Sequence, residues 1–150
     1  APARRLEVRS NRGLAGIDGT VATALGIAMA SQSSPDPGKS AGSTRVLIGD
    51  LALLHDAGSL LLNQAEHRPR IQLFVGNDGG GGIFAGLEAG QSADAAAFDR
   101  VMFTPQSVNI EQLAAAYGWE YSRVESRSEL ERAFTAPVNG PSIIEIPLGR

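Results

Sequence analysis

Two short apolar runs, each followed by a polar tip, constrain the fold of this chain most strongly. Val46 to Ile48 stops at Gly49-Asp50, and Ile71 to Val75 stops at Gly76-Asn77-Asp78. Each run is typical of a buried parallel strand. Between them lies the apolar face of a helical segment, formed by Leu51, Leu54, Leu60, Leu61 and Leu62. The sequence therefore predicts a β-α-β unit, which brings two parallel strand ends to the same edge of a sheet.

The residues that follow the two runs carry oxygen groups suited to a metal ion. Asp50 follows the first strand, and Asn77 and Asp78 follow the second. Because neighbouring strands lie ~4.8 Å apart, Asp50 and one of these two residues converge on a single ion if their strands are close neighbours. Oxygen ligands at such a position favour Mg²⁺ (or Mn²⁺), which takes one or two carboxylates or amides, water and phosphate oxygens. Asn77 and Asp78 both remain open as the second ligand.

Four successive glycines, Gly79 to Gly82, follow the second strand tip. Without side chains they leave the backbone bare, so that a carbonyl can reach a metal ion and amides can approach a phosphate. A plain flexible loop is the alternative, but four glycines cost backbone entropy that a surface turn does not require. We therefore expect a close-approach role for this stretch.

The remainder of the chain alternates between strand and helix patterns. We expect further strands at residues 6–9, 120–124 and 142–146, and helices at residues 17–31, 110–117 and from a cap at Ser126 or Ser128 to Phe134. Asn109 is expected to cap the second of these helices, and Gly118 to end it. Such alternation predicts an α/β fold, a three-layer α/β/α arrangement around a mostly parallel sheet.

Two segments are expected to serve as loops. Residues 32–43 contain no large apolar side chain, so we expect a mobile surface loop. Residues 77–106 are expected to form an active-site loop, and their second part, residues 85–106, reads as a long irregular connection. Its expected anchors are Phe98, Val101 and Phe103.

Composition limits the domain count and the class of partner. A chain of 150 residues with 43% hydrophobic content suffices for a single domain, residues 1–150. The net charge of −3, with Lys39 as the one lysine, argues against nucleic-acid binding. The chain has no cysteine and no apolar run near the ~20 residues that span a membrane, so we expect neither thiolate metal sites nor a membrane span. It begins at Ala1, which suggests a C-terminal piece of a longer multidomain protein.

Three motifs together resemble a known family. The Gly49-Asp50-Leu51 and Gly76-Asn77-Asp78 tips are similar to the GDG and NN signature of thiamine-diphosphate-dependent enzymes, and each departs from it by one residue. Residues 10–19, SNRGLAGIDG, and the glycines that lead into Ile83-Phe84 narrow the match. With these stretches, residues 4–148 resemble the last domain of the 2-succinyl-5-enolpyruvyl-6-hydroxy-3-cyclohexene-1-carboxylate synthases of menaquinone biosynthesis.

The resemblance implies thiamine diphosphate and Mg²⁺ (or Mn²⁺) as cofactors. The cofactor-binding positions that it implies are Gly16, Ile17, Asp18, Gly19, Gly49, Asp50, Leu51, Gly79 and Gly80. Ile17 matches the residue that props the cofactor into its bent form, or is a core residue. Asp18 either contacts the cofactor or caps the following helix, where the helix dipole favours a carboxylate.

The resemblance also implies three substrate-binding residues. Arg12 matches an arginine that holds a substrate carboxylate, a task suited to the planar guanidinium; the alternative is a solvated surface residue. Ile83 and Phe84 match residues that face the active-site cavity, or else they begin a short helix and pack into the core.

The implied reaction is that of a carboligase, a transferase that decarboxylates 2-oxoglutarate and adds the succinyl semialdehyde carbanion to isochorismate. No catalytic residue is expected in this chain, because the glutamate that activates the cofactor belongs to a pyrimidine-binding domain supplied across a homodimer or homotetramer interface. We therefore expect the chain to be inactive alone and the whole enzyme to be cytoplasmic.

Two alternatives remain. One is another thiamine-diphosphate 2-oxoacid decarboxylase or acetolactate-synthase-type enzyme, which the SNRGLAGIDG motif disfavours. The other is a flavodoxin-like or receiver-like Mg²⁺-binding module in which Asp50 accepts a phosphoryl group. That class expects a lysine at a later strand tip, whereas Lys39 lies in the expected mobile loop.

Overall fold

The computed structural model describes residues 7–11, 16–33 and 42–149 of the chain. Its strands are β1 (Thr44–Gly49), β2 (Ile71–Asn77), β3 (Glu120–Arg123) and β4 (Ser142–Pro147). Its α-helices are α1 (Thr20–Gln32), α2 (Asp50–His55), α3 (Glu88–Ser92), α4 (Ala95–Phe98), α5 (Ile110–Ala116) and α6 (Arg127–Thr135). Shorter helical segments are η1 (Ala57–Leu60), η2 (Gly82–Gly86) and η3 (Asp99–Phe103).

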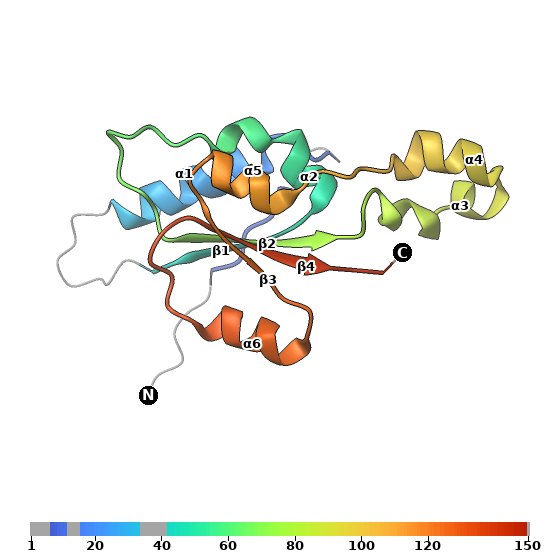
Figure 1. The fold of residues 1–150 in the computed structure, drawn as a ribbon. Coiled ribbons are helices and arrows are strands. Elements are labelled where there is room, and N and C mark those ends of the chain that lie inside the picture. Colours follow the sequence, from blue (N-terminus) through green and yellow to red (C-terminus); the bar gives the residue numbers. More distant parts are fainter. Residues whose placement is uncertain (1–6, 12–15, 34–41, 150) are drawn as a thin grey trace.

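The four strands form one parallel sheet in the order β1-β2-β4-β3. Helices α1, α2 and α5 cover one face of the sheet, and α6 covers the other (Figure 1). The expected three-layer α/β/α fold is therefore confirmed. The central β-α-β unit is confirmed as well, because β1 and β2 are adjacent and parallel, with Gly49 opposite Gly76.

The larger hydrophobic core lies between the sheet and α1, α2 and α5. It includes the fully buried side chains Val21, Leu53, Leu73 and Ile143, and the indole N–H of Trp119 donates to the Leu60 carbonyl at 2.8 Å. A smaller core beneath α6 is built on Phe74, Val124 and Ile144. Because β2 is buried from Ile71 to Val75, the sheet holds the end of this strand firmly.

Several local predictions were wrong. Residues 7–9 form no strand, and the described part of the chain has four strands where five were expected. Helix α1 begins at Thr20, because Gly19 adopts a left-handed conformation with φ of 61° that a helix interior excludes. Asp18 is therefore not the helix cap; Gly19 holds that position without a side-chain hydrogen bond. The central crossover is also less helical than expected, since α2 and η1 end at Leu60.

Other predicted boundaries were confirmed. Asn109 caps α5 by accepting from the Gln112 N–H at 2.8 Å, and Gly118, with φ of 69°, follows its end. Of the two serines proposed to cap α6, Ser126 does so within a reciprocal capping box with Glu129.

The expected irregular connection between β2 and α5 contains helical turns instead. We call residues 82–103 the arm; it comprises η2, α3, α4 and η3 and extends beyond the sheet layers (Figure 1). Phe98 and Phe103 are buried anchors as predicted, whereas Val101 is 59% exposed and is not an anchor. Of the expected mobile loop at residues 32–43, residues 34–41 lie outside the described residues.

Candidate functional site

The ends of β1 and β2 place two polar side chains side by side. Asp50 follows directly after β1 as the first residue of α2, and Asn77 is the last residue of β2. Because the strands are hydrogen-bonded neighbours in parallel register, both residues lie at the same sheet edge. The sequence analysis expected Asp50 and Asn77 to share an ion if their strands were close neighbours, and β1 and β2 are adjacent.

Oxygen atoms of Asp50 and Asn77 converge on one point. The side-chain Nε2 of Gln106 donates to Asp50 Oδ2 at 2.7 Å and to Asn77 Oδ1 at 3.1 Å. Asp50 is 2% exposed, and its other oxygen accepts from the Leu51 N–H at 2.8 Å. A buried carboxylate requires a donor or a cation as its partner, and the Gln106 amide is that partner here.

Asp78 makes different contacts from Asn77. Its Oδ1 accepts from the Gly80 N–H at 3.3 Å, and a Cβ placed at Gly82 would overlap its carboxylate. Asn77 Oδ1 accepts from the Gly79 N–H at 3.1 Å in addition to Gln106. Asn77, and not Asp78, therefore shares the Gln106 amide with Asp50.

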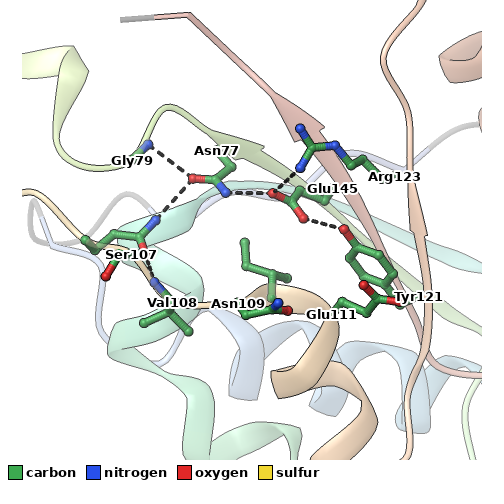
Figure 2. A pocket seen from close by; sticks show the side chains of 11 residues that line it. Asn77, Gly79, Ser107, Val108, Asn109, Glu111, Tyr121, Arg123 and Glu145 are labelled. Atoms are coloured by element: carbon green, nitrogen blue, oxygen red, sulfur yellow. Dashed lines mark hydrogen bonds and ion pairs between the residues drawn. The ribbon is translucent and has the colours of Figure 1, made fainter.

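Glu145 fixes the orientation of the Asn77 amide. Glu145 lies on β4, is 5% exposed, and accepts from Asn77 Nδ2 at 2.7 Å, which directs Asn77 Oδ1 away from Glu145 and toward the Gly79 N–H (Figure 2). Its other oxygen accepts from the Tyr121 hydroxyl, and the Arg123 guanidinium lies 3.8 Å from Glu145 Oε1. Burial and this hydrogen bond to Glu145 raise the pKa of Tyr121 to about 12, so the phenol stays a neutral donor at ordinary pH.

A cavity of about 490 Å³ opens beside this network, between the ends of β2, β3 and β4 and the start of α5 (Figure 2). Asn77, Gly79, Gln106, Tyr121, Arg123 and Glu145 contribute to its lining. Its volume is within the range of pockets that hold small ligands. The convergent oxygens therefore lie next to space that a bound molecule can fill.

Gly80 and Gly81 are closely approached by groups of the arm, whereas the expected approach of a metal ion or a phosphate to the glycines stays a prediction. A Cβ at Gly80 would lie 2.5 Å from the Phe103 carbonyl oxygen, and one at Gly81 would lie 2.8 Å from that of Met102. The Gly81 N–H donates to Phe103 O at 2.6 Å, and the Gln106 N–H donates to Gly79 O at 2.9 Å. These contacts close the base of the arm against the end of β2.

The segment at Gly16 to Gly19 lies at the far end of α2 from Asp50. Asp18 Oδ1 is 3.3 Å from Nδ1 of His55, the last residue of α2, and both side chains are exposed. At ~1.5 Å per residue, His55 stands ~7.5 Å along the helix from Asp50. Ile17 is 40% exposed, so its interpretation as a simple core residue is wrong.

The three expected substrate-binding residues have different outcomes. Arg12 lies outside the described residues. Ile83 is 82% exposed and Phe84 is 37% exposed, and both belong to η2 at the start of the arm. They therefore begin a short helix, as one interpretation held, but they do not pack into the core.

Sequence reasoning missed Gln106 and Glu145. Glu145 had a usable signal, because a single carboxylate interrupts the otherwise apolar run of β4. Gln106 had none: it lies 56 residues from Asp50 and 29 from Asn77 in sequence, and only the closure of the arm brings it to them.

Comparison with known proteins identifies the family. Residues 3–146 match the family described as the thiamine pyrophosphate enzyme, C-terminal TPP binding domain. The chain belongs to this family. The expected cofactor set, thiamine diphosphate with a divalent metal ion, is thereby confirmed, and the receiver-like alternative is wrong.

Relatives of known name narrow the resemblance. The chain is 57% identical over 149 residues to the 2-succinyl-5-enolpyruvyl-6-hydroxy-3-cyclohexene-1-carboxylate synthase of Clavibacter michiganensis, and 56% identical over 150 residues to that of Leifsonia xyli. Each alignment covers 99% of this chain and 25% of the relative. The chain thus spans about a quarter of the length of these curated relatives.

A solved structure shares the fold. The crystal structure of benzoylformate decarboxylase from Polynucleobacter necessarius superposes with a TM-score of 0.61, covering 89% of this chain and 23% of that one at 20% identity.

Among the helices of the described residues, none has the length and apolar character needed to cross a membrane.

Proposed function

We propose that this chain holds the diphosphate of thiamine diphosphate through a divalent cation bound by Asp50 Oδ2, Asn77 Oδ1 and the Gly79 carbonyl. The observation that carries the proposal is that Asp50 Oδ2 and Asn77 Oδ1 converge on Gln106 Nε2, while the backbone N–H of the same residue donates to the Gly79 carbonyl. One carboxylate, one amide and one carbonyl leave positions open for phosphate oxygens and water, as Mg²⁺ and Mn²⁺ require.

The surrounding residues have supporting roles in the proposal. Glu145 holds the Asn77 amide with its oxygen toward the cation, as carboxylates behind metal ligands commonly do. Asp78 is assigned to the glycine turn, in which it accepts from Gly80. Gly49, Leu51 and Gly80 flank the cation position, and Gly16 to Gly19 complete the cofactor-binding set that we propose.

We extend the proposal to the activity of the full-length protein. In this proposal the full-length protein is a cytoplasmic carboligase that decarboxylates 2-oxoglutarate and joins the product to isochorismate. Two relatives at 57% and 56% identity that are named 2-succinyl-5-enolpyruvyl-6-hydroxy-3-cyclohexene-1-carboxylate synthase support the assignment to this class of synthase. The bound cofactor supplies the stabilisation of the carbanion, while the protein positions it. We propose that residues 1–150 act as one diphosphate-binding domain and that residues 77–106 act as an active-site loop. A pyrimidine-binding domain of the same enzyme, across a homodimer or homotetramer interface, supplies the activating glutamate.

Substrate binding is assigned to Arg12, Ile83 and Phe84. Exposed apolar side chains on η2 suit a cavity wall completed by another domain. Both proposed substrates carry spare carboxylates, which a guanidinium holds by paired, charge-assisted hydrogen bonds. Arg12→Ala in the full-length protein is expected to leave thiamine-diphosphate affinity unchanged and to lower kcat/KM roughly tenfold to a hundredfold. A collapse of cofactor affinity in this variant would place Arg12 in the cofactor site instead.

The test of the proposed function measures cofactor binding and turnover separately. The full-length protein is expected to retain thiamine diphosphate in equilibrium dialysis with MgCl₂ and to lose it with a chelator. It is expected to consume 2-oxoglutarate when isochorismate is present, whereas the 150-residue chain alone shows no turnover. Retention of the cofactor without any divalent cation would refute the proposed metal site, and turnover by the isolated chain would refute the need for a second domain.

A further inference from the structure

Gln106 contacts every oxygen of the proposed cation site at once. Its Nε2 donates to Asp50 Oδ2 and Asn77 Oδ1, and its backbone N–H donates to the Gly79 carbonyl. Its own Oε1 accepts from the Val108 N–H at 2.8 Å, which fixes the amide with its NH₂ group toward the two side-chain oxygens. A neutral donor therefore holds the position in which a cation is expected.

The amide and a cation exclude one another. Mg²⁺ binds oxygen at ~2.0–2.1 Å, and Gln106 Nε2 lies 2.7 Å from Asp50 Oδ2 and 3.1 Å from Asn77 Oδ1, so an ion that binds both oxygens from the side of the amide would collide with its NH₂ group. The two amide hydrogens also point at the lone pairs that the ion needs. Rotating the Gln106 amide so that Oε1 faces the ion would turn its NH₂ group toward the Val108 N–H, and that N–H would then lose its acceptor.

We infer that Gln106 is an internal placeholder for the divalent cation: it pairs with Asp50 and Asn77 in the metal-free state, swings out when the ion enters, and so sets the metal affinity of the site. The inference rests on the proposed function. Asp50 is buried, and an unpaired buried carboxylate is costly. Gln106 removes that cost in the metal-free protein, and in doing so it competes with the ion.

The placeholder also connects the ion to the arm. Gln106 lies just beyond the arm, at the base that Gly81 N and Phe103 O close. When its side chain leaves, the Val108 N–H loses its acceptor, while the neighbouring cap of α5, Gln112 N–H to Asn109 Oδ1, is untouched. Metal entry is therefore expected to change the protection of one amide ahead of α5 and to spare another only four positions away.

The first test measures metal affinity. Gln106→Ala and the matched control Gln112→Ala, an exposed glutamine on α5, are compared with the wild-type full-length protein. Each is titrated with MnCl₂ at a fixed thiamine-diphosphate concentration, and free Mn²⁺ is followed by electron paramagnetic resonance. In Gln106→Ala the metal-free state loses the hydrogen bond from Gln106 to the Asp50 carboxylate. Because this state competes with the ion, Mn²⁺ binding is expected to tighten roughly tenfold. Gln112→Ala is expected to match the wild type.

The opposite direction would overturn the inference. Weaker Mn²⁺ binding in Gln106→Ala would mean that Gln106 helps to hold the ion, and unchanged binding would mean that it does not compete. If the wild type itself binds no Mn²⁺, the proposed function fails and the inference fails with it. If the wild type binds and Gln106→Ala does not bind more tightly, the inference alone fails.

The second test follows the side-chain movement directly. In the wild type, hydrogen exchange of the Val108 amide is expected to become faster when MgCl₂ and thiamine diphosphate are added, whereas the Gln112 amide keeps its protection. Unchanged or slower exchange at Val108 in the loaded protein would show that Gln106 stays in place, and the inference would be wrong.

Discussion

The two parts of the proposed site are held in place by different means. Asp50 and Asn77 stand at the ends of β1 and β2, and β2 is buried from Ile71 to Val75. The arm, residues 82–103, is built of short helical turns and leaves Ile83, Leu87 and Val101 at least half exposed. The proposed cation ligands are thus positioned by sheet register, whereas the arm has few buried contacts of its own. A site that combines both can keep its metal geometry constant while the arm adapts to substrate or to another domain.

The largest expected effect is at the strand end itself. Asp50→Ala removes the one charged ligand proposed for the cation, so Mn²⁺ and thiamine-diphosphate affinity are expected to fall more than a hundredfold, beyond the 10–100-fold typical of outer-shell changes. Calorimetric titration of the full-length variant measures this loss. An affinity equal to that of the wild type would reduce Asp50 to a structural residue.

The next effect concerns the junction between the two parts. Gly80→Ala places a methyl group 2.5 Å from the Phe103 carbonyl oxygen, so the base of the arm must shift. We expect destabilisation of about 1–3 kcal/mol, as for other overpacked positions, together with faster exchange of the Gly81 amide, which donates to Phe103. Gly86→Ala is the control, because a Cβ there meets nothing within 4 Å. Equal stability of the two variants would mean that the arm base is loosely packed.

A smaller effect is expected from the residue behind Asn77. Glu145→Gln keeps an acceptor but loses its charge, so the Asn77 amide is held less firmly and Mn²⁺ affinity is expected to fall roughly tenfold. Glu125→Gln is the control, because Glu125 pairs with the same arginine, Arg123, at 2.9 Å without touching Asn77. A drop of similar size in both variants would assign the effect to Arg123.

The same variant has a second readout in the titration of Tyr121. The raised pKa of about 12 means that the neutral phenol stabilises the fold at pH below its ordinary value near 10, and that this contribution is lost as pH rises through 12. Loss of the Glu145 charge is expected to lower the Tyr121 pKa, seen as earlier tyrosinate absorbance in an alkaline titration. Tyr121→Phe identifies the signal, and an unchanged titration in Glu145→Gln would contradict the contact.

The smallest structural effect is expected on the exposed surface of the arm. Ile83→Ser alters a side chain that is 82% exposed, so the free energy of unfolding is expected to change by less than about 0.5 kcal/mol. Substrate use by the full-length protein is nevertheless expected to fall several-fold if Ile83 lines the substrate cavity. Leu61→Ser, at 74% exposure and away from the arm, should leave both unchanged. Normal kcat/KM in Ile83→Ser would remove Ile83 from the substrate site.

This contrast also explains what the sequence could predict. The strands at Val46 to Ile48, Ile71 to Val75 and Ser142 to Ile146 were predictable because short, mostly apolar runs identify buried parallel strands. Turn and cap residues such as Asn109 and Gly118 act locally, so they too were predictable. The adjacency of the two strand tips that carry Asp50 and Asn77 followed from those elements.

The wrong or missing predictions have different physical causes. The start of α1 was misplaced because the left-handed conformation of Gly19 is not readable from its neighbours. The turns of the arm are too short to show helical periodicity. Gln106 reaches the site through contacts between Gly79 to Gly81 and Phe103 to Gln106, which depend on how the chain closes.

The central claim is that Asp50 and Asn77, and not Asp78, hold the cation. It is tested most directly by calorimetric titration of thiamine diphosphate with MgCl₂ into full-length Asn77→Ala and Asp78→Ala. We predict that Asn77→Ala loses roughly tenfold or more in cofactor affinity, as expected for removal of a group at the metal, while Asp78→Ala stays near the wild type. Retained affinity in Asn77→Ala together with a loss in Asp78→Ala would contradict the account.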